Sequence, residues 1–234
     1  MMRIPFMKYL AAFVAVLAVT PSLADSPFNG KDLSNWEAKK ESKGKNSWVV
    51  GTPTLDPSNP KVLKVEPGAS ALINAVSAHG QGWDLYTSEK WGGTFRIELE
   101  LMVPNGSNSG VYVMGEYEVQ VLDSHGKPDK DMSAGDIGAI YSAAVPKLNA
   151  ARKPGEWQKF VIDFAAPQFD AAGKKTANAN FIQVTLNDQV LHSNVEMKGP
   201  TPGGLTGQEH STGPLMFQGN HGAAAFRNIS IKPL

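Results

Sequence analysis

The chain has 234 residues and no cysteine, and its 22 basic residues balance its 22 acidic ones. The absence of cysteine excludes disulfides and a cysteine nucleophile, and the balanced charge excludes the concentrated basic surface that nucleic-acid binding requires. The 23 glycines and 16 prolines are spread along the chain, which favours many short strands joined by turns over long helices.

Residues 1–24 predict a signal peptide. Two basic residues precede an apolar run from Tyr9 to Val19, and Ser22-Leu23-Ala24 forms a small-residue cleavage pattern. The run is shorter than the roughly 20 apolar residues that a membrane helix needs, so we expect no membrane span in the mature form; the alternative is an uncleaved N-terminal anchor helix. Residues 25–234 would then be a single exported domain, periplasmic or secreted.

Alternation of apolar and polar residues predicts strands along most of the mature chain. The first are short and cover Ser47–Val50, Val62–Glu66 and Ala71–Asn74. Between them, the proline-rich and polar stretch Thr52–Pro60 predicts a long surface loop. The clearest alternation covers Thr94–Val103, where one face is apolar and the other carries charged residues.

The run Gly110–Asp123 alternates in the same way, and Gly115 marks a bend or a hairpin within it. Asn187-Asp188 predicts a two-residue hairpin turn, and Thr201–Gly213 a second long surface loop. The remaining predicted strands cover Ile137–Tyr141, Trp157–Phe164, Phe181–Leu186, Gln189–Val195, Pro214–Gln218 and Ala225–Ile231.

These strands, roughly a dozen in one domain, favour two packed antiparallel sheets, because a single open sheet would leave an apolar face and two edges exposed. No repeat, charge block or interdomain linker interrupts residues 25–234. We therefore predict an all-β fold, a two-sheet antiparallel jelly-roll sandwich.

Familiar catalytic signatures are absent: the chain has no HExxH, no GxSxG and no phosphate-cradling Gly-Lys-Ser/Thr loop. No two of the five histidines have the i, i+2 or i, i+4 spacing, so the sequence encodes no local zinc site. Oxygen ligands can be gathered from loops without any pattern, which leaves a divalent cation such as calcium open. The chemistry therefore falls to carboxylates, histidines and arginine.

One segment concentrates such residues. Glu116, Glu118 and Gln120 share one face of a valine-rich strand that ends in Asp123-Ser124-His125. If this strand lies in a curved sheet, its polar face is the floor of a groove, where loss of hydration raises the pKa of a carboxylate and makes it a usable base. The alternative is an outer sheet face open to solvent.

A second cluster lies near the C-terminus, where Gln218, His221 and Arg227 could point to one site. Arginine suits an oxyanion or an array of sugar hydroxyls; its alternative role is a surface ion pair. Among the tryptophans, Trp83 and Trp91 flank a predicted loop and are the candidates for sugar contact, while Trp48 and Trp157 are expected in the core.

Six islands of sequence occur in order along nearly all of the mature chain. They are Phe28-Asn29-Gly30-Lys31-Asp32-Leu33 with Trp36, Asn108-Ser109-Gly110-Val111, Tyr117-Glu118-Val119-Gln120-Val121-Leu122-Asp123, Gly138-Ala139-Ile140-Tyr141, Pro154-Gly155-Glu156-Trp157 and Phe226-Arg227-Asn228-Ile229. Together these islands resemble the 3-keto-disaccharide hydrolase domain family. The resemblance implies a concanavalin A-like jelly-roll fold and activity on 3-keto-glycosides, small-molecule sugars already oxidised at C3 by an upstream sugar 3-oxidoreductase.

On this resemblance, a ketone at C3 acidifies the C2 hydrogen, so that a base can drive loss of the C1 substituent, and water addition then completes a net hydrolysis. Glu118 would be the base, Arg227 with or without a bound cation would stabilise the enolate, and His125 or His221 would protonate the leaving oxygen. A conventional hydrolysis that pairs Glu118 with Asp123 or Glu116 stays open. The substrate-binding candidates are Gln120, Gln218, Asn108, Tyr141, Trp83 and Trp91.

The chain departs from the family at two places. In Phe217-Gln218-Gly219-Asn220-His221-Gly222, family members commonly have Leu-Gln, one or two residues and then His-Gly, a spacing that still fits. Many relatives carry an arginine soon after the Asn-Ser-Gly strand, where this chain has Met114-Gly115-Glu116, so no arginine can bind substrate there. Two other classes of function remain, a non-catalytic lectin-like carbohydrate-binding module on the same fold and an interaction protein with no sugar chemistry.

Overall fold

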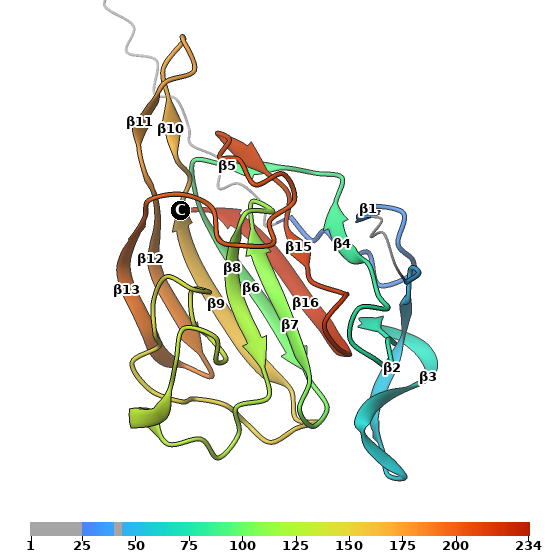
Figure 1. Cartoon of the computed structure of the whole chain (residues 1–234). Coiled ribbons are helices and arrows are strands. Elements are labelled where there is room, and N and C mark those ends of the chain that lie inside the picture. Colours follow the sequence, from blue (N-terminus) through green and yellow to red (C-terminus); the bar gives the residue numbers. More distant parts are fainter. Residues whose placement is uncertain (1–24, 40–43) are drawn as a thin grey trace, which may run out of the picture.

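The computed structural model of the chain describes residues 25–39 and 44–234. The predicted signal peptide, residues 1–24, lies outside the described residues. In the described ranges, two antiparallel sheets of seven and five strands face each other (Figure 1), which confirms the predicted all-β jelly-roll sandwich. Within the same ranges, no helix has both the length and the hydropathy that crossing a membrane would require.

The seven-stranded sheet has the strand order β13-β12-β9-β6-β16-β3-β2. The five-stranded sheet has the order β1-β4-β15-β7-β8. The seven strands are β2 (Trp48–Asp56), β3 (Asn59–Asn74), β6 (Thr94–Met102), β9 (Gln158–Ala165), β12 (Ala179–Leu186), β13 (Gln189–Met197) and β16 (Ala224–Pro233). The five are β1 (Trp36–Lys39), β4 (Asp84–Thr87), β7 (Asn108–Val113), β8 (Tyr117–Leu122) and β15 (Met216–Phe217).

Two short ribbons and one helical turn complete the described chain. β5 (Trp91–Gly92) pairs with β14 (Thr212–Gly213), and β10 (Gln168–Phe169) pairs with β11 (Lys175–Ala177). The β10–β11 hairpin extends away from the sandwich at the top of Figure 1. A single 3₁₀ turn, η1, covers Asp129–Asp131.

The core lies between the two sheets and is filled by alternate residues of each strand. In β6, Phe95, Ile97 and Leu99 are each at most 3% exposed, because a strand turns every second side chain to the same face. Phe217 of β15 and Phe226 of β16 join the sheets: their rings stack with centroids 3.9 Å apart and planes 1° from parallel. This burial is the main favourable contribution to folding, since no disulfide supports the chain.

The two predicted hairpins are confirmed. The run Gly110–Asp123 folds back on itself as β7 and β8, and Met114 and Gly115 at the turn have φ of 55° and 72°. Asn187 and Asp188 join β12 to β13 with φ of 51° and 66°, the positive values that suit the right-handed twist of a two-residue hairpin.

The prediction of a surface loop over Thr52–Pro60 is wrong. These residues form the tip of the β2–β3 hairpin, in which Thr52 lies opposite Glu66 and Leu55 opposite Leu63. Only two residues make the turn, and the backbone N–H of Ser58 in it donates to Asp56 Oδ1 at 2.8 Å. Proline is tolerated because β2 is the edge strand of its sheet. Likewise, the two strands predicted within 62–74 are one continuous strand, β3.

The segment predicted as a strand over Ile137–Tyr141 lies along the free edge of β8 without forming a regular strand. It bonds to β8 through Gly138 N to Gln120 O at 2.8 Å and Tyr141 N to Glu118 O at 3.0 Å. Gly138 has a φ of 76°, a left-handed conformation that interrupts an extended chain. The predicted loop over Thr201–Gly213 is confirmed, apart from its last two residues, which form β14.

Candidate functional site

The outer face of the five-stranded sheet, which points away from the core, carries the polar side chains of two neighbouring strands. Asn108 and Tyr112 of β7 lie directly opposite Leu122 and Glu118 of β8. Their chain neighbours, such as Val111, point inward and are fully buried. The period of two that builds the core therefore also builds the floor of a site.

A pocket of about 170 Å³ opens on this floor. It brings together six of the residues that the sequence singled out, namely Asn108, Glu118, Gln120, Tyr141, Gln218 and His221. Tyr112, Pro202 and Gly203 complete its lining. Glu118 is 1% exposed, so its side chain is withdrawn from water and the alternative of a solvated outer face does not describe it.

Glu118 is the electrostatic centre of the pocket. Burial raises the pKa of its carboxyl group to about 8, which the hydrogen bond from Tyr112 opposes and the charge of Asp84 reinforces. The hydroxyl of Tyr112 donates to Glu118 Oε2 at 2.8 Å. A carboxyl whose pKa lies near neutral pH can exchange a proton during a reaction, as a general base or acid must.

Gly110 leaves the space that Glu118 occupies. It faces Gln120 across the hairpin, and a Cβ atom at this position would overlap the Glu118 carboxylate. Glycine is therefore required here for close approach, independently of backbone conformation. In the Asn-Ser-Gly motif of β7, Asn108 therefore lines the pocket and Gly110 leaves room for the Glu118 side chain.

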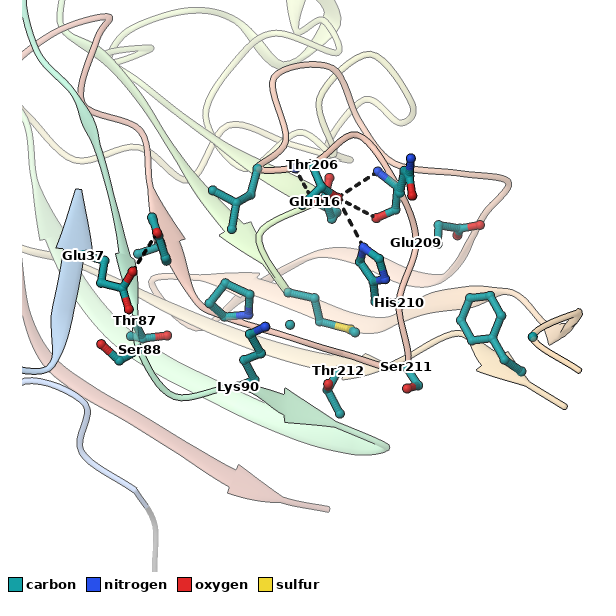
Figure 2. Close-up of a pocket in the computed structure, with 18 residues that line it drawn as sticks. Glu37, Thr87, Ser88, Lys90, Glu116, Thr206, Glu209, His210, Ser211 and Thr212 are labelled. Carbon is teal, nitrogen blue, oxygen red and sulfur yellow. Dashed lines mark hydrogen bonds between the residues drawn. The ribbon is translucent and has the colours of Figure 1, made fainter. Parts of the chain in front are cut away.

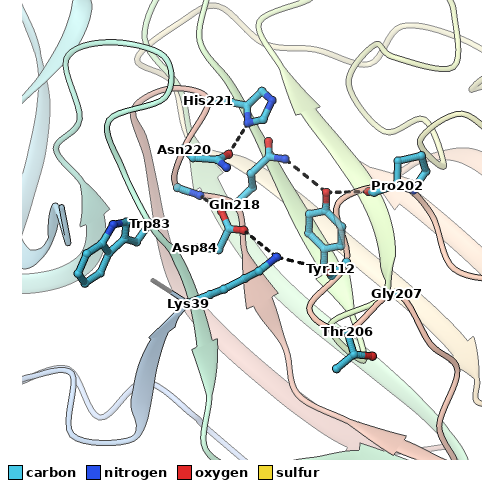
Figure 3. A network of polar contacts seen from close by, with 12 residues as sticks. Lys39, Trp83, Asp84, Tyr112, Pro202, Thr206, Gly207, Gln218, Asn220 and His221 are labelled. Carbon is cyan, nitrogen blue, oxygen red and sulfur yellow. Dashed lines mark hydrogen bonds and ion pairs between the residues drawn. The ribbon is translucent and has the colours of Figure 1, made fainter. Parts of the chain in front are cut away.

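A chain of hydrogen bonds orients the carboxylate through Tyr112. Gln218 Nε2 donates to the Tyr112 hydroxyl at 3.3 Å, and the same hydroxyl lies 3.1 Å from the Pro202 carbonyl (Figure 3). Burial and the negative charge of Glu118 raise the pKa of Tyr112, so this hydroxyl keeps its proton. Tyr112 was not selected from the sequence, although its position opposite Glu118 in the hairpin is the signal that could have identified it.

An ion pair lies beside this chain of hydrogen bonds. Lys39 of β1 is opposite Asp84 of β4, with Nζ 3.9 Å from Oδ2, and Nζ also donates to the Gly204 carbonyl at 3.2 Å (Figure 3). Asp84 is 3% exposed and accepts the backbone N–H of Gly219 at 2.8 Å. Both residues escaped sequence analysis because each is isolated in the chain and only sheet pairing brings them together.

His221 stands at the rim of the pocket. Its Nδ1 contacts Asn220 Oδ1 (Figure 3). Its ring meets the ring of His79 edge-on, with the ring centroids 4.5 Å apart. His221 is partly exposed, so it can reach both solvent and a ligand in the pocket. Of the two histidines predicted to protonate a leaving oxygen, only this one lines the pocket.

Three predicted catalytic residues are not brought to the pocket. Asp123 lies beyond the end of β8, where Oδ2 accepts the Gly106 N–H at 2.9 Å, and His125 is exposed in the following turn. Arg227 lies on the opposite side of the sandwich: Phe226 points into the core, so the next side chain faces outward. There Arg227 Nε donates to Glu100 Oε2 at 2.6 Å, the surface ion pair that was its alternative role.

The tryptophans predicted to contact sugar do not line the pocket either. Trp91 packs against the core, and its indole N–H lies 3.3 Å from Asp25 Oδ2. The Trp83 carbonyl accepts the indole N–H of Trp48 at 2.7 Å. Trp48 is buried as expected, while Trp157 is half-buried beneath the Arg227 guanidinium, which lies 3.9 Å from its ring centroid.

A larger hollow of about 760 Å³ lies on the other side of the 201–213 loop (Figure 2). Its buried carboxylate, Glu116, is fully occupied: it accepts the backbone N–H of Thr206 at 2.7 Å, the Thr206 hydroxyl at 2.7 Å and the Gly207 N–H at 2.9 Å. Glu116 therefore anchors the loop. Because Asp123 is also engaged elsewhere, neither carboxylate proposed as a partner of Glu118 lines its pocket.

In the described ranges, no group of three or more His, Cys, Asp or Glu side chains is placed to hold a metal ion. A cation bound by fewer such side chains together with amide, hydroxyl or carbonyl oxygens is a different kind of site.

Comparison with known proteins gives two kinds of similarity. Residues 24–232 match the family described as the 3-keto-alpha-glucoside-1,2-lyase-like domain. A solved structure from Parabacteroides distasonis, described provisionally as a glycosyl hydrolase, is 30% identical over 90% of this chain and 84% of its own, with a TM-score of 0.65. A second from the same organism, with the same description, has 18% identity over 90% and 94% of the two chains and a TM-score of 0.55, a likeness of fold. No curated protein sequence matches the chain.

Proposed function

Because the chain belongs to the family of 3-keto-alpha-glucoside-1,2-lyase-like domains, we propose that it cleaves 3-keto-glycosides by eliminating the C1 substituent, with Glu118 as the base. Family membership makes the chain a carbohydrate-active protein; the substrate and the reaction are the proposal. The provisional glycosyl hydrolase description of the 30% identical relative supports cleavage of a glycosidic bond.

The elimination has a simple electron balance. The Glu118 carboxylate removes the hydrogen from C2, and the electron pair of the C–H bond passes into an enolate with the C3 ketone. When the C1–O bond breaks, the enolate re-forms the ketone beside a new C1–C2 double bond, and the leaving oxygen departs with its electron pair and takes up a proton. Addition of water across C1 and C2 then gives net hydrolysis.

Each residue of the pocket has a role in this proposal. Tyr112 holds the carboxylate in place through its 2.8 Å hydrogen bond. The side-chain amides of Gln120 and Gln218 and the hydroxyl of Tyr141, which line the pocket, provide donors for the enolate oxygen and the sugar hydroxyls. His221 at the rim protonates the leaving oxygen. The enolate-binding role that the resemblance implied for Arg227 passes to these donors.

One observation carries the proposal: a single carboxyl group with a pKa near 8 lies 1% exposed in a small polar pocket. Proton abstraction beside a ketone needs one base matched to the operating pH. A conventional glycosidase needs two carboxyl groups on either side of the bond. Glu118 is the one carboxylate among the described residues that line this pocket, an arrangement that favours elimination.

The test is turnover of a panel of 3-keto-glycosides and of their unoxidised parents by the purified mature chain and by Glu118→Gln. We expect turnover of the ketones alone, and its loss in the folded Gln variant. Turnover of the parents but not of the ketones would refute the proposal. Sugar-dependent thermal stabilisation that survives Glu118→Gln, with no turnover, would instead identify a lectin-like binding module.

The wider setting is also part of the proposal. A 3-keto-glycoside must be supplied by an oxidoreductase that acts on C3 of the sugar, so we propose such an enzyme as the upstream partner. We also propose that the chain works after export, in the periplasm or outside the cell.

A further inference from the structure

Two segments of chain form hydrogen bonds with the edge strand β8, and both of them bond to the backbone of Glu118. The Glu118 carbonyl accepts the Tyr141 N–H at 3.0 Å, whereas the Glu118 N–H donates to Thr201 Oγ1 at 2.9 Å. On one side of this point β8 pairs with residues 138–141; on the other, the Glu116 carbonyl accepts the Thr201 N–H at 2.9 Å. Residues 138–141 and the segment that begins at Thr201 therefore separate at Glu118, the proposed base.

A second pocket, of about 410 Å³, lies where these segments diverge. It shares Tyr141 and Pro202 with the Glu118 pocket, so the two adjoin across these two side chains. Its full lining is Tyr141, Ser142, Ala143, Glu196, Met197, Lys198, Gly199, Pro200, Thr201 and Pro202.

The size of the Glu118 pocket makes a neighbouring compartment necessary. Its volume of about 170 Å³ lies below the roughly 300–1,000 Å³ that is typical of pockets for larger ligands. One sugar ring therefore fills it, and anything attached to that ring must lie outside. The second pocket is the adjoining compartment, since Tyr141 and Pro202 line both pockets.

The walls of the second pocket suit a sugar. Tyr141, Pro200 and Pro202 offer ring faces against which the C–H face of a pyranose can pack. Ser142, Glu196 and Lys198 add a hydroxyl, a carboxylate and an ammonium group, which can hydrogen-bond sugar hydroxyls.

We infer that this second pocket is the leaving-group subsite, which receives the C1 substituent of the 3-keto-glycoside, a hydroxylated group of the size of a second sugar. The inference rests on the proposed function and deepens it. With the keto ring over Glu118, the C1 substituent extends past Tyr141 and Pro202 into the second pocket. The departing group is then held by chain segments that are hydrogen-bonded to the backbone of Glu118 itself.

The test is to fill the pocket from each wall and to measure selectivity. Gly199→Trp is well tolerated in principle, because a Cβ atom there meets nothing within 4 Å, and Ala143→Trp fills the pocket from the opposite, exposed wall. Val145→Trp is the matched control, since Val145 is 51% exposed and lines neither pocket. The substrates are methyl 3-keto-glucoside and a 3-keto-glucosyl disaccharide.

We expect Gly199→Trp and Ala143→Trp to lower the ratio of kcat/KM for the disaccharide to that for the methyl glycoside by about tenfold or more, a loss typical of steric discrimination in a pocket. Val145→Trp should leave the ratio unchanged. If the unmodified protein turns over both substrates and neither pocket variant alters the ratio, the subsite assignment alone is overturned. If the unmodified protein turns over neither, the proposed function fails and the subsite assignment fails with it.

Discussion

At the scale of single residues, Glu118 combines two properties that are usually opposed. It is 1% exposed although it lies on the outer face of a sheet, and within the part of the chain that the structure describes its carboxyl group has one side-chain hydrogen-bond partner, Tyr112. Loss of hydration without a compensating positive charge is what raises a carboxyl pKa. The charge of Asp84, which forms an ion pair with Lys39, further disfavours ionisation of Glu118.

The pH dependence of the reaction should report this group. A general base works as the carboxylate, so kcat/KM for a 3-keto-glycoside should rise with pH and level off above about 8, the pKa of Glu118. The measurement is a pH profile of kcat/KM. A decrease through the same pH range would show that Glu118 acts as a proton donor, the role of the acid in conventional hydrolysis.

Replacing Tyr112 by Phe should shift this profile. The Tyr112 hydrogen bond lowers the pKa of Glu118, so its removal should move the rising limb of kcat/KM to higher pH and reduce the rate at pH 7. Tyr86→Phe is the matched control, because that hydroxyl donates to Glu37 at 2.9 Å and Tyr86 does not line the Glu118 pocket. An unchanged profile in Tyr112→Phe would show that this hydroxyl does not position the base.

The raised pKa also predicts a cost in stability. The folded state binds the Glu118 proton up to about pH 8, whereas an ordinary glutamate loses it near 4.5, so the free energy of unfolding should fall as pH rises between these values. Glu118→Gln removes this dependence. The variant should therefore gain a few kcal/mol over the parent protein between pH 4.5 and pH 8, at about 1.4 kcal/mol per pKa unit at most. Urea unfolding at several pH values measures the difference, which would be constant if the group titrated normally.

At the scale of elements, the 201–213 loop decides whether the outer face of the five-stranded sheet is a pocket or an open surface. Thr201 Oγ1 accepts the Glu118 N–H at the edge of β8, and the Leu205 N–H donates to the Gly115 carbonyl at 2.7 Å. Between these contacts, Pro202 and Gly203 form a wall of the Glu118 pocket. The β7–β8 hairpin therefore supplies both the base and the turn that holds the loop over it.

Removing the carboxylate that anchors this loop should affect both stability and activity. In Glu116→Ala, the N–H groups of Thr206 and Gly207 and the Thr206 hydroxyl lose their acceptor. A loss of about 1–3 kcal/mol in the free energy of unfolding is expected when partly buried donors are left unpaired, together with a lower kcat/KM because Pro202 and Gly203 move. Glu156→Ala, at an exposed position, is the control. Unchanged unfolding in Glu116→Ala would show that other contacts hold the loop.

At the scale of the whole molecule, the two outer faces of the sandwich carry different kinds of side-chain interaction. The outer face of the seven-stranded sheet carries surface ion pairs, among them Arg96 with Asp163 and Arg227 with Glu100. The outer face of the five-stranded sheet carries the pocket. Strand β16 belongs to the seven-stranded sheet. Its Phe226 points into the core and its Arg227 lies on the outer face of that sheet, so Arg227 is separated from the pocket by both sheets.

Export makes a prediction about the whole chain. Cleavage after Ala24 should leave a mature protein that begins at Asp25, because small residues precede this bond. The mass of the protein purified from a host that secretes it measures the N-terminus. A mass that still includes residues 1–24 would support the uncleaved anchor helix instead.

The sequence by itself determined the alternation of the strands, and through it the jelly-roll fold and the shared face of Glu118 and Gln120, because burial of one strand face leaves a period of two in the chain. It also placed Gln218 and His221 correctly near that face. Some predictions from the sequence were wrong. Arg227 was expected at the site, but it points outward because the neighbouring Phe226 points into the core. Residues 52–60 were expected to form a long loop, but their turn-forming residues belong to a hairpin with a two-residue turn.

Only the tertiary structure decided which polar face is buried. Glu116, Glu118 and Gln120 share one face of the predicted strand, yet the carboxylate of Glu116 anchors a loop, whereas that of Glu118 lines the pocket and has a pKa near 8. The difference comes from Tyr112 and Asp84, which act on Glu118, and from Thr206 and Gly207, which donate to Glu116. All four lie on another strand or far along the chain. A pKa depends on hydration and on nearby charges, and both are fixed by contacts that only folding creates.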